Sequence, residues 1–295
     1  MPKLRVIKIG DKNLFNSYLK KNKYMSSEMN FTNLFMWRNQ YNLKFFEIND
    51  MLCIIAHLEK ESFAFTPIGK YSKDGFKNAI NAIREYFHEN RWEIVFKRVE
   101  ESKLKYFEQY EKVVISDRDN SDYLYLSDRL ISLKGEKYHS KRNHINNFIK
   151  LYNYEYVKFN EDYVEEALRI NEEWCNKRNC ETNKTLYGEK LANIEVLKNF
   201  MNLDCKGALI KVNGKFEAYT VGELISSDCA VIHIEKANSD IRGLYTFINQ
   251  KFCENEWRNV SLINREQDLG IDGLRKAKMS YNPVDFVNKY DVWLK

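Results

Sequence analysis

Residues 207–235 read GALIKVNGKFEAYTVGELISSDCAVIHIE, and this stretch decides the fold. Apolar and polar residues alternate through 207–212, 216–224 and 230–235, as expected for strands with one buried face. The pair Asn213-Gly214 favours a tight hairpin turn, because both residues accept the positive φ that such a turn requires. The stretch therefore predicts an antiparallel meander of three strands.

The elements around this meander form a succession that is predicted twice along the chain. In the second half, a strand at 154–159 and helices at 162–178 and 186–202 precede the meander. A helix at 240–256, a strand at 260–264, a short helix at 273–279 and a strand at 290–294 follow it. The first half repeats this order. It has a strand at 4–9, helices at 11–22 and 28–39, and three strands at 43–48, 51–57 and 62–66. A helix at 72–89, a strand at 92–98, a helix at 100–110 and strands at 113–116 and 123–126 follow. The repeat predicts a tandem duplication of one α/β unit.

The expected fold class is therefore α/β, with mixed sheets of the α+β type. We expect an N-terminal domain at 1–127, a basic linker helix at 128–152 and a C-terminal domain at 153–295. The C-terminal domain is the expected location of the active site.

Composition limits the class of protein further. Apolar residues make up 44% of the 295 residues and aromatic residues 14%, which is enough for a packed core. The net charge of +5 is too small to identify a nucleic-acid binder by itself. The longest apolar run, 51–56, is far shorter than the roughly 20 residues of a membrane-spanning helix, and no signal peptide is recognisable, so a cytoplasmic location is expected. The six cysteines and five histidines lack the spacing of metal ligands, so we expect buried thiols and no metal.

A strongly polar segment lies near the end of the chain. It reads NREQDLG at 264–270 and GLRKAKMSY at 273–281. Such a mixture of acids, bases and amides indicates the floor of a binding site, or an internal ion-pair network that fastens the last helix to the sheet. The candidate substrate-binding residues are Asn264, Arg265, Glu266, Asp268, Arg275 and Lys278.

The element order and several motifs resemble those of known transferases. The motifs are KRNHINNF at 141–148, HIEKAN at 233–238 and the two polar runs above, with Pro283 after Ser280-Tyr281. The order is similar to the N-acetyltransferase (GNAT) fold, and the double arrangement resembles Fem-type aminoacyltransferases and the phosphatidylglycerol lysyltransferase C-terminal domain (DUF2156-like). The resemblance implies two tandem GNAT-like domains and transfer of an acyl or aminoacyl group. It leaves a small molecule, a peptide or a lipid headgroup open as acceptor, and no transmembrane half is expected.

In this fold class the protein holds an activated ester or thioester beside an amine or hydroxyl, and donors at a splayed strand polarise the carbonyl. The period of a strand places His233 and Glu235 on one face, and either is a candidate base. Tyr281 is the candidate proton donor to the leaving group. Glu173 and Trp174 are candidates for the acceptor side. The alternatives are that these groups form ion pairs or belong to the core.

The donor is the next question. Acyl-CoA enzymes of this fold bind pyrophosphate at the start of the helix after the meander, and there Arg242 and Gly243 fit the expected pattern. Asp240, however, would repel a phosphate and is expected to cap the helix instead, so coenzyme A is disfavoured. Fem-like relatives use aminoacyl-tRNA, and a stripe of basic residues in the expected linker helix suits phosphates or is a solvated face. The stripe consists of Lys137, Lys141 and Arg142.

The leading hypothesis is an aminoacyl- or acyltransferase without a tightly bound cofactor, with aminoacyl-tRNA favoured over acyl-CoA as donor and a cleft between the copies. A rival hypothesis is a non-catalytic module that binds an anionic or amino-acid-like ligand. A third is a structural duplication whose polar segment is an ion-pair lock.

Overall fold

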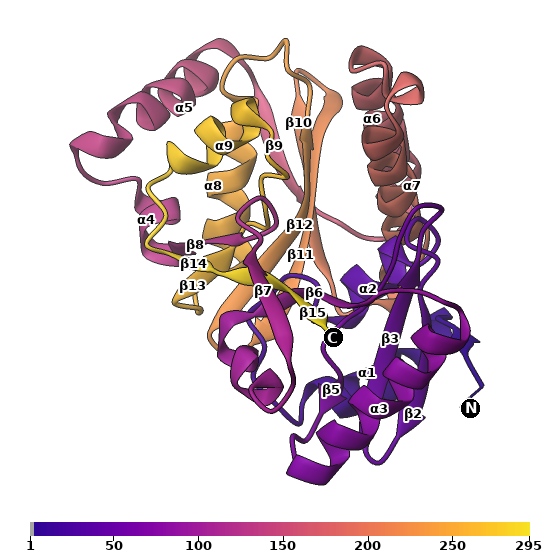
Figure 1. Ribbon diagram of the computed structural model, residues 1–295. Coiled ribbons are helices and arrows are strands. Elements are labelled where there is room, and N and C mark those ends of the chain that lie inside the picture. The colour runs from indigo at the N-terminus through magenta and orange to yellow at the C-terminus, as the bar shows by residue number, and fades with distance from the viewer. Residues whose placement is uncertain (1–2) are drawn as a thin grey trace. The chain divides into compact units, whose positions relative to one another are not determined.

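Two mixed β-sheets organise the chain, each in its own compact unit (Figure 1). The computed structural model describes residues 3–295. The first unit comprises the chain up to Asp122 together with 267–272 and 286–295, and the second comprises 123–266 and 273–285. Each unit therefore contains segments that are far apart in the sequence.

The sheet of the first unit has the order β1-β2-β3-β4-β6-β15-β7, and a short strand β5 pairs with β3. The strands are β1 (Arg5–Val6), β2 (Lys44–Ile48), β3 (Met51–His57), β4 (Ser62–Ala64), β5 (Ile68–Gly69), β6 (Ile94–Glu100), β7 (Lys112–Ser116) and β15 (Lys289–Leu294). The helices are α1 (Lys12–Leu19), α2 (Phe31–Trp37) and α3 (Lys73–Glu89), with 3-10 segments at Ile9–Asp11 and Glu101–Phe107. Strand β4 runs parallel to β6.

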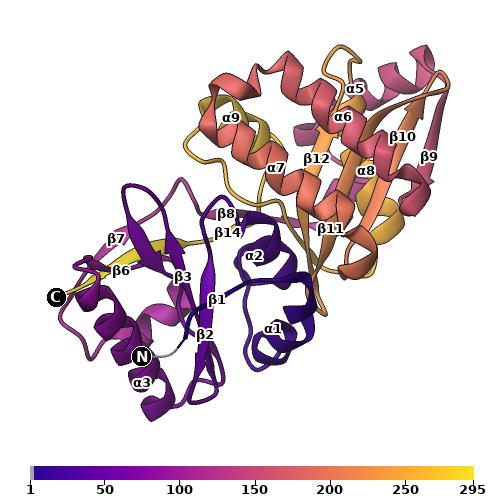
Figure 2. The ribbon, with the colours of Figure 1, turned by 90° about the vertical axis from the view of Figure 1, so that its right-hand side faces the viewer.

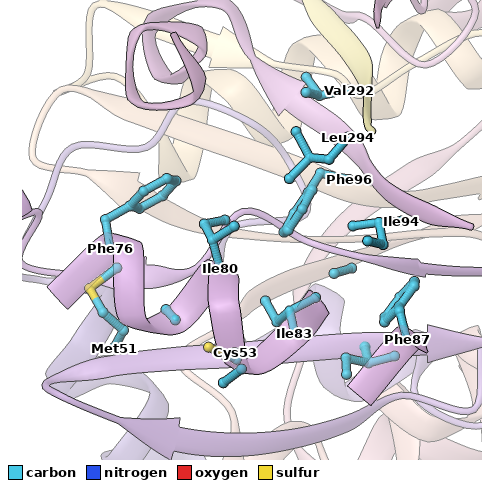
Figure 3. Close-up of a cluster of buried hydrophobic side chains, with 14 of the residues drawn as sticks. Met51, Cys53, Phe76, Ile80, Ile83, Phe87, Ile94, Phe96, Val292 and Leu294 are labelled. Carbon is cyan, nitrogen blue, oxygen red and sulfur yellow. The ribbon is translucent and has the colours of Figure 1, made fainter. Parts of the chain in front are cut away.

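Helix α3 supplies one side of the first unit's hydrophobic core (Figure 3). The helix begins after Ser72, whose Oγ accepts a hydrogen bond from the Gly75 N–H at 3.1 Å. Its apolar face meets side chains of β3, β6 and β15; the cluster includes Met51, Cys53, Phe76, Ile80, Ile83, Phe87, Ile94, Phe96, Val292 and Leu294. The last strand of the chain thus completes the core of the first unit.

The sheet of the second unit has the order β14-β8-β13-β12-β11-β10-β9. The strands are β8 (Asp122–Leu126), β9 (Tyr154–Lys158), β10 (Lys206–Val212), β11 (Lys215–Ser226), β12 (Cys229–Ala237), β13 (Leu262–Asn264) and β14 (Asp285–Val287). The helices are α4 (Ser127–Ser132), α5 (His139–Leu151), α6 (Val164–Lys177), α7 (Lys184–Lys198), α8 (Leu244–Glu256) and α9 (Asp272–Met279), with 3-10 segments at Glu136–Tyr138, Glu161–Tyr163, Cys180–Thr182 and Phe200–Asn202. Helices α6 and α7 cover one face, and α5, α8 and α9 lie on the other (Figures 1 and 2).

The two sheets correspond strand for strand. From one edge to the other, the first reads β1-β2-β3-β4-β6-β15-β7 and the second reads β9-β10-β11-β12-β13-β8-β14. The sixth strand of each sheet comes from the opposite half of the sequence, β15 in the first and β8 in the second. The compact units therefore differ from the contiguous ranges 1–127 and 153–295, because two strands are exchanged.

Most local elements agree with the sequence pattern. Both meanders form, and their turns have the expected positive φ angles, 45° and 61° at Asn49 and Asp50, and 48° and 90° at Asn213 and Gly214. The helix predicted at 100–110 is a 3-10 segment instead. The helix predicted from residue 240 begins only at Leu244, and its N-cap is Gly243 rather than Asp240.

The expected linker helix belongs to the second unit. It is divided into α4 and α5, and α5 packs against α8. The rings of Phe148 and Phe247 lie 4.6 Å apart at this contact. The segment is thus part of a packed layer, because Leu133, Tyr138, Ile145 and Phe148 are buried in the second unit's core.

Candidate functional site

The sheet of the second unit splays open between β12 and β13. These parallel strands are in register only from the Cys229–Leu262 pair to the Val231–Asn264 pair, although β12 continues to Ala237. After β13 the chain turns sharply at Glu266, which has a φ of 56°. Side chains that follow the last paired residues therefore lie at the opening of the sheet.

Glu235 and Arg265 meet at this opening. Arg265 Nη2 lies 3.1 Å from Glu235 Oε1, and Asn249 of α8 donates a hydrogen bond of 2.8 Å to Glu235 Oε2. The side chains of Glu235 and Arg265 are only 14% and 12% exposed. Burial opposes the charged form of Arg265, but the carboxylate of Glu235 outweighs it and raises the pKa of Arg265, so the guanidinium stays charged.

Two polar atoms beside this ion pair lack partners. Arg265 Nη1 and Asn249 Oδ1 are buried and have no hydrogen-bond partner within residues 3–295. A buried polar atom without a partner costs about 1–3 kcal/mol unless a ligand or water satisfies it. Residues 3–295 contain eleven such side-chain atoms, and these two share Glu235 as a neighbour. One is a donor and the other an acceptor, and both adjoin Glu235.

Tyr281 and Lys141 complete the cluster. Lys141 Nζ lies 3.9 Å from the centroid of the Tyr281 ring, and Arg265 Cζ lies 4.7 Å from the same centroid. Tyr281 is held by its backbone, because its carbonyl oxygen accepts a hydrogen bond of 3.0 Å from the hydroxyl of Tyr138. Burial raises the pKa of Tyr281, against the opposing charge of Arg265, so the phenol keeps its proton at neutral pH. Burial, and then repulsion by Arg265, lower the pKa of Lys141 to about 8.

His233 is enclosed by two carboxylates. Its Nδ1 lies 2.9 Å from Glu266 and its Nε2 lies 3.0 Å from Glu223, and its side chain is fully buried. Burial opposes protonation, but the hydrogen bonds to Glu223 and Glu266 outweigh it and raise the pKa of His233 to about 9. Both ring nitrogens are occupied, so the geometry favours a role in positioning Glu266 over the role of base predicted for His233.

The predicted polar segment is divided between the two units. Asn264 accepts a hydrogen bond of 2.7 Å from the Glu266 N–H, and Lys278 donates to the carbonyl oxygen of Arg265. Asp268 belongs to the first unit, where it accepts a bond of 2.9 Å from the Gly270 N–H and lies 3.4 Å from Arg118. Arg275 is partly exposed on α9. Asp268 is therefore not part of the Glu235 cluster within the second unit.

Glu173 and Trp174 lie on the other face of the second unit's sheet. The Trp174 indole N–H donates to Tyr245 at 2.8 Å, and Lys236 Nζ lies 3.3 Å from the Trp174 ring centroid. Glu173 pairs with Arg169 at 2.7 Å. Both predicted residues line a pocket that also includes Glu217. They are separate from Glu235, because neighbouring residues of β12 point to opposite faces.

The predicted phosphate-binding residues have varied surroundings. A Cβ added to Gly243, which has a φ of 91°, would lie 2.4 Å from the carbonyl oxygen of His144 in α5, so this glycine permits close helix packing. Asp240 pairs with Lys177 at 2.6 Å. Arg142 donates to the carbonyl oxygens of Leu133 and Gly135 at the end of α4, which removes it from the predicted stripe. Lys137 and Arg242 are exposed.

The sequence pattern does not identify Asn249 or Glu223 as site residues, and it predicts a different role for Lys141. Asn249 gives no local signal, since a single amide within an apolar helix is common. The basic stripe predicts that Lys141 contacts tRNA phosphates, whereas in the structure its ammonium lies over the ring of Tyr281. An acid within the apolar strand run 221–225 could have indicated Glu223, because such a position is buried and requires a partner.

Neither a metal-binding cluster nor a membrane-spanning helix is found among residues 3–295. Within 3–295, no group of three or more His, Cys, Asp or Glu side chains is arranged to hold a metal ion. Among the helices of the same residues, none combines the length and the apolar character needed to cross a membrane.

Comparisons with known proteins agree with the fold. The family described as phosphatidylglycerol lysyltransferase, C-terminal, matches residues 21–293. An uncharacterised protein of Mycoplasmoides gallisepticum (strain R(low / passage 15 / clone 2)) is 24% identical over 181 residues, which are 60% of this chain and 58% of that protein. The match thus spans less than two thirds of that relative.

Solved structures extend the comparison over the whole chain. A conserved protein of unknown function from Bacteroides thetaiotaomicron VPI-5482 is 33% identical, with complete coverage of both chains and a TM-score of 0.91. L-PGS from Bacillus licheniformis is 13% identical over 97% of this chain and 92% of that chain, with a TM-score of 0.69. A tandem GNAT protein from the clavulanic acid biosynthesis pathway is 8% identical over 100% and 98% of the two chains, with a TM-score of 0.52. The predicted fold of two tandem GNAT-like domains is confirmed.

Proposed function

The chain belongs to the phosphatidylglycerol lysyltransferase C-terminal family, and from this premise we propose that it transfers an activated aminoacyl group to an amine or hydroxyl acceptor. The proposal names aminoacyl-tRNA as donor in preference to acyl-CoA. The reacting groups are placed at the splay between β12 and β13, where Glu235, Arg265, Asn249 and Tyr281 converge.

One observation carries the proposal: the unpartnered pair of Arg265 Nη1 and Asn249 Oδ1 on either side of Glu235. An aminoacyl ester has complementary groups, since its carbonyl oxygen accepts hydrogen bonds and its α-amino group donates them. The carbonyl oxygen would accept a hydrogen bond from Arg265 Nη1. The α-amino group would donate hydrogen bonds to Asn249 Oδ1 and to Glu235. A plain acyl group has no amine for the second contact.

The proposed step uses groups already in the cluster. The acceptor nitrogen or oxygen attacks the carbonyl carbon of the ester, and Glu235 takes the proton that the acceptor loses. The bond between the carbonyl carbon and the ester oxygen then breaks, and the leaving ribose oxygen receives a proton from Tyr281. Burial keeps the phenol protonated for this role. Solvent exchange returns the two side chains to their starting protonation states.

The start of α8 supports the preference against coenzyme A. In the GNAT fold the pyrophosphate of coenzyme A lies at this helix start. Here the backbone of α5 packs against Gly243, and the carboxylate of Asp240 is nearby. The exposed cations Lys137 and Arg242 are on the same unit and could contact tRNA phosphates.

The test measures donor consumption and product formation with charged tRNA and with acyl-CoA, against a panel of amines and alcohols. Wild type should use charged tRNA. Glu235→Gln should lower the rate about 100-fold, the usual range for removal of a general base. Glu165→Gln, an exposed acid on α6, is the matched control and should be unaffected.

Failure of wild type to consume either donor with any acceptor would refute the transferase proposal. Binding of an aminoacyl ester analogue without turnover would instead favour the rival hypothesis of a binding module. Loss of that binding in Asn249→Leu would assign it to the same pair of buried atoms.

A further inference from the structure

Lys141 has an unusual position for a lysine on a helix surface. Its ammonium lies over the ring of Tyr281, and it forms no hydrogen bond or ion pair with residues 3–295. An ammonium has three donors and no acceptor, so it normally finds carboxylate, carbonyl or water partners. Because Lys141 is only partly buried, its donors can reach either water or a ligand at this point.

The helix that carries Lys141 is firmly held. Phe148 of α5 packs on Phe247 of α8, and the α5 backbone at His144 contacts Gly243. Arg142, the next residue along the chain, is anchored by the carbonyl oxygens at the end of α4. The backbone position of Lys141 is thus set by packing. Its side chain is partly buried against Tyr281, whereas Lys137 and Lys150 of the same segment are exposed.

The second cation at Tyr281 is Arg265, whose Nη1 also lacks a partner. We propose that Lys141 and Arg265 together form an oxyanion-binding site for the carbonyl oxygen of the donor ester. This inference rests on the proposed aminoacyl transfer. When the acceptor attacks, the carbonyl π electrons move to that oxygen, and they return when the ester bond breaks. Lys141 and Arg265 stabilise the negative charge between these events and keep their protons.

The surroundings of Lys141 give the reaction a pH signature. The charged and titratable groups that face it are Arg265 after β13, Glu235 of β12, Tyr281 after α9 and His144 of its own helix. Since the pKa of Lys141 is lowered to about 8, kcat should fall as pH rises through about 8. An arginine at this position would stay charged, so Lys141→Arg should lose that fall.

The experiment compares Lys141→Met, Lys141→Arg and the matched control Lys150→Met, which alters an exposed lysine on the same helix. Lys141→Met should lower kcat about 100-fold, as expected for loss of one oxyanion donor, with KM for charged tRNA changed less than threefold. Lys150→Met should match wild type. Thermal melting checks the fold, and Lys141→Met should melt no lower than wild type because it removes a half-buried charge.

A raised KM with unchanged kcat in Lys141→Met would overturn the inference and restore the predicted role of Lys141 in contacting tRNA phosphates. A fall in kcat above pH 8 that persists in Lys141→Arg would also overturn it.

A second measurement does not require turnover. Trinitrobenzenesulfonate labelling, followed by mass spectrometry, should show protection of Lys141 but not Lys150 by a non-hydrolysable 3′-aminoacylamido-adenosine. Binding of that analogue without protection refutes the oxyanion site alone. Absence of both binding and transfer refutes the proposed function, and the oxyanion site with it.

Discussion

At the scale of single residues, burial decides the chemistry of the site. His233 and Glu235 are two residues apart on one strand, and the strand pattern predicts either of them as the base. In the structure, His233 is enclosed by Glu223 and Glu266, whereas Glu235 contacts the two side chains with unpartnered atoms. The difference arises from neighbours contributed by β11, α8 and the turn after β13.

The hydrogen-bonded group of His233 with Glu223 and Glu266 predicts that the stability of the fold depends on pH. The folded pKa of about 9 is above the ordinary value of about 6.5, so protonation stabilises the fold. This contribution is fully present below about pH 6.5 and is lost as pH rises through about 9. Its size is on the order of 3 kcal/mol at most.

Urea unfolding of wild type and His233→Gln checks this. The free-energy difference between the two proteins should shrink from pH 6.5 to pH 9.5. A difference that stays constant over this range would show that the imidazole is not preferentially protonated in the folded state.

At the scale of elements, the backbone of α5 packs closely against Gly243 at the start of α8. Gly243→Ala should destabilise the protein by about 2–4 kcal/mol, because the new methyl group meets the His144 carbonyl and the φ angle is unfavourable. Gly214→Ala is a matched control: its φ is 90°, but no atom lies within 4 Å of the added Cβ, so it should cost only about 1 kcal/mol. Chemical denaturation measures both.

If Gly243 instead belonged to a phosphate-binding loop, the two substitutions would lower the free energy of unfolding equally. Only Gly243→Ala would then weaken the binding of charged tRNA or acyl-CoA. That outcome would show that the start of α8 is part of the donor-binding site.

At the scale of the whole molecule, the exchanged strands predict which fragments fold. Residues 123–285 contain every strand from β9 to β13 and most of β8, and should unfold cooperatively. Residues 128–295 lack β8, which lies between β13 and β14, and should not fold cooperatively. Thermal melts followed by circular dichroism distinguish the two fragments.

Cooperative folding of 128–295 and not of 123–285 would contradict the exchange. It would instead support the contiguous domains expected from the repeat.

The sequence by itself determined the two meanders, their turns and the order of elements, because strand alternation and positive-φ turns are local properties of the chain. It also placed Glu235, Arg265 and Tyr281 among the candidates, since polar residues at the ends of apolar elements are visible in the pattern. Only the tertiary structure decided the exchange of β8 and β15, which depends on strand pairing between distant segments. Only the tertiary structure separated Asp268 from Glu266 and brought Lys141 to Tyr281, because which side chains meet depends on how separate elements pack.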